Sequence, residues 1–169
     1  MKKSIMVAAF LLLCFMLSAG NLPKGRYRYQ GDVLLYGYAA TQSDAKGYAA
    51  TVETVHGVDF GNGLFVGLGT GLKYSFTNLE TFVPVYAEGR YYFNPSRIRP
   101  FVSLSLGGEF CLARPDNSVL VSPAFGLYIG SFAIKFGYCY NAGFSEAWTY
   151  NLNSIRLGVG YAFGARHKK

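Results

Sequence analysis

Charged residues are scarce in this chain of 169 residues: they make up 15% of it, and histidine occurs only twice. Cysteine is also rare, with three residues. A disordered chain is rich in charge and poor in aromatic residues, so this composition excludes disorder as the state of the whole protein. Two histidines and three cysteines offer few ligands for a zinc site of the usual spacing. The length suits one compact domain.

Helical periodicity is also missing, because no stretch after the first twenty residues repeats its apolar positions every three to four residues. Aromatic residues, in contrast, make up 17% of the chain, and there are 21 glycines. Abundant glycine and aromatic residues with few charges favour many short strands or contact with lipid.

The N-terminus has the three parts of a secretory signal peptide. Met1-Lys2-Lys3 is the positive region, Ile5 to Leu17 is the apolar core, and Ser18-Ala19-Gly20 is the small-residue cleavage site. A membrane-anchoring helix is the alternative, but the apolar run is shorter than the ~20 residues that span a bilayer. We therefore predict that residues 1–20 are cleaved and that residues 21–169 form the mature domain.

Removal of the signal peptide leaves fourteen cations and nine acids, a net charge of +5. The cations do not cluster on a helix with interleaved aromatic residues, as they would in a nucleic-acid-binding segment. Many lie instead where turns and tails are expected, for example at Lys24, Arg97 and Lys168. Export makes nucleic acid an unexpected partner.

Segments of roughly ten residues with strict alternation recur along the mature chain, and each ends in turn residues. From Leu64 to Tyr74, large apolar residues occupy one face, and Gly67, Gly69, Gly71 and Lys73 occupy the other. Polar residues of ordinary size would cover the second face of a strand in a soluble sandwich. Glycines there indicate a crowded, narrow interior, and the alternation is typical of transmembrane strands.

Counting such segments predicts an all-β fold: an eight-stranded, antiparallel, up-and-down transmembrane β-barrel. The connections are short and rich in turn residues, so consecutive strands form hairpins and no parallel crossover fits. The expected strands cover approximately residues 27–39, 48–56, 63–75, 81–93, 100–112, 119–129, 132–140 and 150–163.

Aromatic residues gather near both ends of the expected strands, as they do in the girdles at the two interfaces of a membrane. One group includes Tyr27, Phe132 and Phe163, and the other includes Phe110 and Trp148. A soluble barrel of the lipocalin type is the alternative, but its outward faces would be polar. The outward faces here are apolar.

Eight charged residues fall on the inward faces, four acids and four cations. In a barrel of eight strands the side chains just fill the interior, and an unpaired charge there is costly. We therefore predict a closed network of salt bridges rather than a pore. Its members are Asp32, Glu53, Lys73, Glu88, Arg90, Glu109, Lys135 and Arg156.

Counting from the hairpin turns places Lys135 directly opposite Arg156 on the last two strands. Two adjacent cations require anions nearby, and the inward acids at similar depth are Asp32, Glu53 and Glu88. We expect Arg90 to join this layer, and Lys73 and Glu109 to form a second layer nearer the outside of the cell.

Catalytic chemistry has little support in the sequence. A barrel that acts on lipid A as a deacylase or acyltransferase needs a histidine with a serine and a carboxylate in reach. His56 is expected to face outward while Glu53 faces inward, and His167 lies in a basic tail. Cys111 and Cys139 would lie on strands separated by a third, too far apart for a disulfide, so two inward thiols are expected. No cofactor and no metal are expected.

The last strand resembles the C-terminal sorting signal of bacterial outer-membrane barrels. Arg156, Gly158, Tyr161 and Phe163 match its polar residue, its glycine and its two alternating aromatic positions. The aromatic residue usually ends the chain, whereas here Gly164 to Lys169 follow. The resemblance implies that the barrel-assembly machinery reads this strand during insertion.

The segment from Val83 to Phe93, continuing from Arg99 to Leu104, resembles the small outer-membrane β-barrel family abundant in Bacteroidetes, which shares the architecture of the outer membrane protein A transmembrane barrel. This resemblance implies a fold and a location in the outer membrane, with outer-membrane lipids as neighbours. It implies no reaction.

Together these observations predict a monomeric, non-enzymatic outer-membrane protein with a structural or surface-interaction role. Two alternatives remain, a lipid-modifying enzyme and a narrow channel. The barrel would be the anchor, and short loops at Thr41–Lys46 and Asn141–Thr149 would carry any binding.

Overall fold

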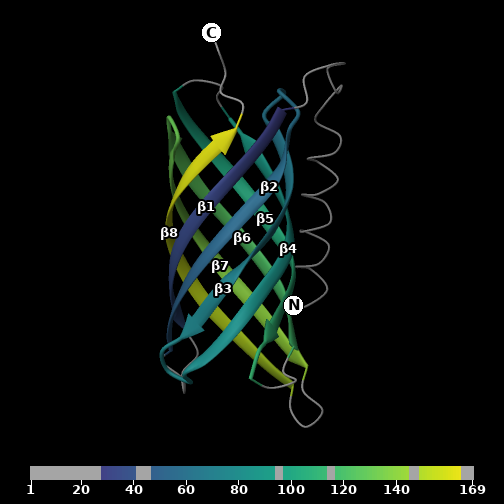
Figure 1. Ribbon diagram of the computed structural model, residues 1–169, viewed down its shortest axis with the longest axis vertical. Coiled ribbons are helices and arrows are strands. Elements are labelled where there is room, and N and C mark those ends of the chain that lie inside the picture. Colours follow the sequence, from purple (N-terminus) through teal and green to yellow (C-terminus); the bar gives the residue numbers. More distant parts are fainter. Residues whose placement is uncertain (1–27, 41–46, 94–96, 114–116, 145–148, 165–169) are drawn as a thin grey trace.

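The computed structural model describes residues 28–40, 47–93, 97–113, 117–144 and 149–164, which form a closed antiparallel barrel (Figure 1). Every strand pairs with its neighbours in sequence, and β1 also pairs with β8, so the predicted fold class is confirmed. The predicted signal peptide lies outside the described residues. The strands are β1 (Arg28–Ala40), β2 (Tyr48–Asp59), β3 (Leu64–Ser75), β4 (Glu80–Tyr92), β5 (Ile98–Cys111), β6 (Asn117–Ile129), β7 (Phe132–Phe144) and β8 (Thr149–Gly164).

Strand boundaries agree with the predicted ones to a few residues, except at β7. This strand continues to Phe144, and β8 begins at Thr149, so the loop predicted at Asn141–Thr149 is wrong. Residues 141–144 are paired with 149–152 on β8, and only residues 145–148 connect the two strands. The other predicted loop, Thr41–Lys46, lies outside the described residues.

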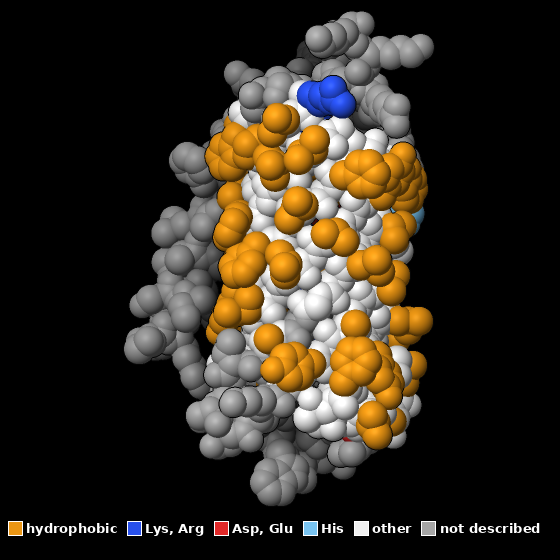
Figure 2. Space-filling model, turned by 90° about the vertical axis from the view of Figure 1, so that its left-hand side faces the viewer, with side chains coloured by type: hydrophobic (Ala, Val, Ile, Leu, Met, Phe, Trp, Pro, Cys, Tyr) orange, Lys and Arg blue, Asp and Glu red, His pale blue; other side chains and the backbone are white. Residues whose placement is uncertain are grey.

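The barrel is apolar outside and polar inside, the reverse of a soluble protein. On the outer wall Leu68 is 71% exposed and Leu157 is 58% exposed, whereas Arg90 and Glu88 inside are 0% exposed. Figure 2 shows apolar side chains over the full height of the wall, with cationic side-chain atoms at one end. Exposed apolar surface of this extent is stable only in contact with lipid. Within the described ranges, no helix is long and apolar enough to cross a bilayer.

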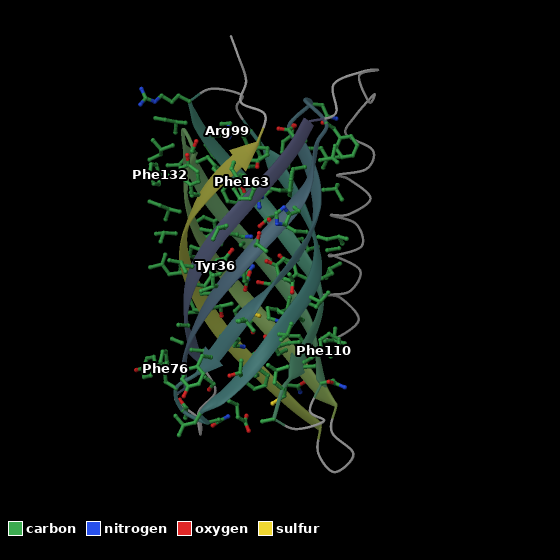
Figure 3. All side chains as sticks on the ribbon, viewed as in Figure 1. Tyr36, Phe76, Arg99, Phe110, Phe132 and Phe163 are labelled. Carbon is green, nitrogen blue, oxygen red and sulfur yellow. The ribbon has the colours of Figure 1, made fainter. Side chains whose placement is uncertain are left out.

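The two ends of the barrel carry exposed aromatic residues. We call the end where β1 begins and β8 ends the terminal end, and the opposite end the loop end. Figure 3 shows Phe132 and Phe163 near the terminal end and Phe76 and Phe110 near the loop end. All four are at least 40% exposed. Their placement matches the predicted girdles, although Trp148 and Tyr27 lie outside the described residues.

Glycines on the inner faces make room for large interior side chains. The aromatic ring of Tyr86 occupies the space that a Cβ at Gly69 would need, and the ring of Tyr36 does the same at Gly158. Tyr86 and Tyr36 are 2% and 3% exposed. The inward glycines of β3 therefore leave space for large side chains in a narrow interior, as the sequence indicates.

Tight turns join the strands at the terminal end. The β6–β7 turn has two residues, and Gly130 adopts a φ of 64°, which hairpin turns of this length require. In the β2–β3 turn, the side-chain oxygen of Asp59 accepts a hydrogen bond from the Gly61 amide at 2.7 Å. Such short connections fix the register of each hairpin and thereby the depth of every inward residue.

Candidate functional site

The candidate site is the interior of the barrel, because the structure buries all eight predicted network residues there. Each has an exposed fraction of 6% or less. The eight residues come from seven strands, and four positive and four negative charges balance one another. The residues are Asp32, Glu53, Lys73, Glu88, Arg90, Glu109, Lys135 and Arg156.

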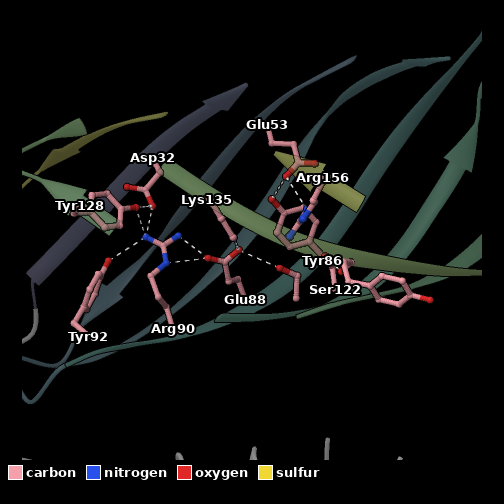
Figure 4. Close-up of polar contacts among 12 residues, drawn as sticks. Asp32, Glu53, Tyr86, Glu88, Arg90, Tyr92, Ser122, Tyr128, Lys135 and Arg156 are labelled. Carbon is pink, nitrogen blue, oxygen red and sulfur yellow. Dashed lines mark hydrogen bonds and ion pairs between the residues drawn. The ribbon is translucent and has the colours of Figure 1, made fainter. Parts of the chain in front are cut away.

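Arg90, near the end of β4, is the centre of the network (Figure 4). Its Nη1 donates to Asp32 Oδ2 at 2.5 Å and to the Tyr92 hydroxyl at 3.0 Å, and it also contacts the Tyr128 hydroxyl. Its Nε and Nη2 donate to Glu88 Oε1 at 2.9 and 2.5 Å. One guanidinium thus holds two carboxylates, a use that its planar fork of donors allows.

Glu88 connects Arg90 to the opposite wall of the barrel. Its second oxygen, Oε2, accepts hydrogen bonds from Lys135 Nζ at 2.8 Å and from the Ser105 hydroxyl at 3.0 Å. The carboxylate therefore has two cationic partners and one neutral donor in a fully buried position. This number of partners offsets the cost of removing the charges from water.

Glu53 and Arg156 lie next to this group, on β2 and β8. The Tyr86 hydroxyl donates to Glu53 Oε2 at 2.5 Å, and Arg156 Nη1 lies 3.9 Å from the same oxygen. The guanidinium of Arg156 also stacks on the Tyr36 ring, with 4.8 Å between its Cζ and the ring centroid. Buried cation–π contacts of this kind are stabilising.

Lys73 and Glu109 form a separate pair nearer the loop end. The Lys73 ammonium donates to both carboxylate oxygens of Glu109, at 2.9 and 3.1 Å. The Phe82 ring lies 5.6 Å from the same nitrogen. The structure therefore contains two groups of charges along the barrel axis, the arrangement expected from the sequence.

One predicted contact is wrong. Lys135 lies opposite Gly158, and Arg156 lies opposite Gly137, so the two cations are displaced from each other by two residues. The cause is the unequal extension of the two strands into the predicted loop. β7 continues four residues beyond its predicted end and β8 begins one residue earlier, so the centre of the loop and the register move. Each cation then reaches a different acid, because Lys135 binds Glu88 and Arg156 approaches Glu53.

An aromatic cluster on the terminal-end side of Arg90 was not predicted from the sequence. Its four rings lie on adjacent strands at the terminal end. Three of them, Tyr92, Phe101 and Tyr128, contact one another edge to face or tilted, with centroids 5.1 to 5.9 Å apart. The Arg90 guanidinium lies 4.8 to 5.9 Å from four ring centroids. Arg99 stacks on two of these rings at 5.0 and 5.4 Å. We call these rings the aromatic floor: Phe65, Tyr92, Phe101 and Tyr128.

The residues with catalytic potential are dispersed. His56 faces outward, where Thr54 Oγ1 lies 2.8 Å from its Nε2 and the Phe163 ring lies 5.9 Å away. Glu53 is on the inner side of the same strand. Cys111 and Cys139 are free thiols, as expected. Among the described residues, no three His, Cys, Asp or Glu side chains gather as a metal site would need.

The four residues that resemble a sorting signal alternate across the wall of β8. Arg156 and Gly158 face the interior, while Tyr161 and Phe163 are 45% and 40% exposed on the outside. The Tyr161 ring contacts the Phe132 ring of β7 at 5.4 Å. The outer part of the motif is therefore available on the surface that faces lipid.

A closed barrel of eight strands with an apolar exterior and a charged, filled interior is the fold of small outer-membrane β-barrel proteins. The outer-membrane location predicted from the sequence agrees with this fold and is confirmed. No protein-family model matches the chain, and no curated protein matches its sequence.

Solved structures of outer-membrane barrels share the fold. The outer membrane enzyme PagL superposes with a TM-score of 0.64 at 15% identity, over 77% of this chain and 98% of that chain. Neisserial surface protein A superposes with a TM-score of 0.55 at 19% identity, over 82% of this chain and 97% of that chain. The Yersinia pestis outer membrane protein Ail superposes with a TM-score of 0.50 at 13% identity, over 82% of this chain and 100% of that chain. Identities this low show the fold alone, and the narrower resemblance to Bacteroidetes barrels stays a prediction.

Proposed function

We propose that this chain is a non-enzymatic outer-membrane protein whose closed barrel anchors it and whose loop end carries a structural or surface-interaction role. The observation that carries this proposal is the filled interior. Buried ion pairs occupy the barrel along its axis, and the aromatic floor packs against them near the terminal end. A barrel filled in this way is suited to hold its loops in place rather than to pass solutes.

A lipid-modifying enzyme is the first alternative, and the shared fold includes one outer membrane enzyme. Such a site needs a carboxylate next to an accessible histidine. In this barrel the wall of β2 separates His56 from Glu53. One hydrogen-bond partner of His56 is the Thr54 hydroxyl, a contact that suits a histidine with a structural role at the membrane surface.

A narrow channel is the second alternative, and it leads to a direct test. In planar bilayers, we expect the mature protein to show no stable conductance, because buried ion pairs and the aromatic floor fill the interior. The double substitution Phe101→Ala and Tyr128→Ala should introduce a leak by removing half of the floor. Phe125→Ala, at a ring 59% exposed on the outside, is the matched control and should stay closed. Steady porin-like currents through the unaltered protein would overturn the proposal.

Insertion by the barrel-assembly machinery is part of the proposal, with β8 as the strand that is read. The exposed rings of Tyr161 and Phe163 support it, since both are on the outside of the wall and the Tyr161 ring contacts the Phe132 ring of β7. The remaining partners are membrane lipids in contact with the outer wall.

The proposed orientation places both termini in the periplasm, as an even number of strands requires when the chain is inserted from that side. Asn117, exposed at the start of β6, would then face the cell exterior. In a background with Cys111→Ser and Cys139→Ala, we expect Asn117→Cys to react with an impermeant thiol reagent on intact cells. Arg97→Cys, at the terminal end, should react only after permeabilisation. The opposite pattern would invert the orientation.

A further inference from the structure

The outward faces of β7 and β8 change from apolar to polar toward the loop end. Nearer the terminal end, Phe136 of β7 lies opposite Leu157 of β8, and both side chains are exposed. In the described parts of these two strands, no outward position holds a charged residue. Toward the loop end the outward positions hold two phenols and two amides, which we call the polar ladder: Tyr138, Tyr140, Asn151 and Asn153.

The tyrosines and asparagines of the polar ladder form hydrogen bonds across the two strands. The Tyr138 hydroxyl donates to Asn153 Oδ1 at 2.5 Å, and the Tyr140 hydroxyl donates to Asn151 Oδ1 at 2.8 Å. Both bonds are diagonal, because Tyr140 lies directly opposite Asn153. Each phenol therefore fixes an amide by its oxygen and does not use the amide nitrogen.

The amide of Asn151 retains hydrogen-bond donors for a ligand. Its side chain is exposed, and within the described part of the chain its Nδ2 has no hydrogen-bond partner. An amide that faces hydrocarbon without a partner is costly. A polar group at the depth of the lipid headgroups, next to the end of the apolar wall, would remove that cost.

We propose that the polar ladder binds the sugar headgroup of a glycolipid in the leaflet that surrounds the loop end. The sugar hydroxyls would accept hydrogen bonds from the Asn151 amide and donate hydrogen bonds to the phenol oxygens. The faces of the tyrosine rings are negatively polarised and would contact the C–H groups of the sugar. The acyl chains would lie on Phe136 and Leu157. This inference rests on the membrane-spanning barrel of the proposed function.

A glycolipid fits this surface better than a phospholipid or a soluble sugar. Cations bind a phosphate group best, and the polar ladder contains none. Sugar hydroxyls combine a donor with an acceptor, as the amide and phenol groups of the polar ladder do. Because the apolar wall continues directly from the polar ladder, a molecule that covers both needs a sugar joined to an apolar part. A soluble sugar would contact the polar ladder alone.

The test uses the mature protein, isotope-labelled at its asparagine nitrogens, in phosphatidylcholine nanodiscs. Glucosyl diacylglycerol is added, and NMR follows the side-chain amide resonances. We expect the Asn151 and Asn153 resonances to shift saturably. Phosphatidylglycerol with the same acyl chains should bind about fivefold more weakly, the factor that one net hydrogen bond supplies. The exposed Asn78, in the β3–β4 turn at the same end, is the internal control and should not shift.

Matched variants locate the binding. Asn151→Leu removes the amide at similar size and should abolish the preference for the glycolipid, as read from the Asn153 resonance. Tyr140→Phe removes the hydroxyl that holds Asn151 and should weaken binding about fivefold. Tyr74→Phe makes the same change on the outward face of β3, where Tyr74 is 40% exposed, and should have no effect. The folded band on unboiled gels shows separately whether each barrel is inserted.

Three results would overturn the proposal. Equal binding of the two lipids would show that the acyl chains alone are recognised. Equal shifts with free glucose would assign the surface to a soluble sugar. Shifts that grow with protein concentration in detergent micelles, without glycolipid, would mean that a second copy of the chain covers the polar ladder. Recovery of a chemically altered glycolipid would support the binding site and contradict the non-enzymatic role.

Discussion

Glu88→Gln should lower the free energy of unfolding by about 3 kcal/mol, the loss typical of removing one partner from a buried ion pair. Glu88 accepts hydrogen bonds from Arg90, Lys135 and Ser105, and the side chain is completely buried. A neutral amide in its place would leave the Lys135 ammonium without its countercharge. Urea unfolding in detergent micelles, followed by the shift between folded and unfolded bands on unboiled gels, measures the change.

A second substitution tests whether charge is the cause. Adding Lys135→Gln to Glu88→Gln should recover about 1–2 kcal/mol, because it removes the uncompensated ammonium. Arg90→Gln is a poorer choice, since Arg90 also binds Asp32. The comparator Glu109→Gln breaks a pair with one cation near the loop end and should cost less than Glu88→Gln. An unfolding midpoint unaffected by Glu88→Gln would show that the network does not stabilise the barrel.

Gly107→Ala should destabilise the barrel by about 2–3 kcal/mol, although it adds a single methyl group. An added Cβ at Gly107 would collide with the carbonyl oxygen of Val85 and lie 2.5 Å from the Cα of Tyr86. These are backbone atoms of the paired strand β4, so they can move only if the strand moves. The same unfolding experiment measures the effect.

Gly37→Ala is the matched control, because it makes the same chemical change on the outside of the wall. A Cβ at Gly37 would meet no atom within 4 Å. The residue is in an ordinary strand, where alanine restricts the unfolded chain more than glycine does, so the barrel should be unchanged or slightly more stable. Equal destabilisation by the two substitutions would mean that the close approach at Gly107 is not the cause.

The alternation of residues predicted most of the fold and the membership of the charge network. In a thin barrel wall every second side chain faces lipid, so the sequence of a strand such as β3 shows directly which side is inside. For that reason Lys73 and Glu88 could be assigned to the interior without knowledge of their partners. The partners depend on the register between strands, which alternation alone does not determine.

The error at Lys135 shows why the register was harder to predict. Residues 141–144 include a polar asparagine and a glycine, a composition that predicts a loop. The structure continues β7 through them, with Asn141 buried and accepting a hydrogen bond from the Cys139 thiol at 3.0 Å. Inward positions of a barrel favour polar residues, so polarity is weak evidence for a loop there.

The aromatic floor could not be predicted for a related reason. Phe65 and Phe101 face inward, but their chemistry is the same as that of the rings that face lipid. Only the three-dimensional arrangement shows that they meet Arg90 at 4.8 and 5.2 Å. An arginine two residues from the end of a strand, with aromatic residues at the ends of the neighbouring strands, is the signal that would indicate such a cluster.

The distribution of the inward charges among hairpins bears on how the barrel can enter a membrane. The β1–β2 hairpin carries two of the acids, Asp32 and Glu53, and the β7–β8 hairpin carries two of the cations, Lys135 and Arg156. Neither hairpin can neutralise its own charges, and charge in hydrocarbon is costly. The partners of these charges lie on other hairpins. Asp32 pairs with Arg90 and Lys135 pairs with Glu88, both partners on β4, and Arg156 approaches Glu53 from β8. Insertion of either hairpin alone is therefore disfavoured by its uncompensated charge.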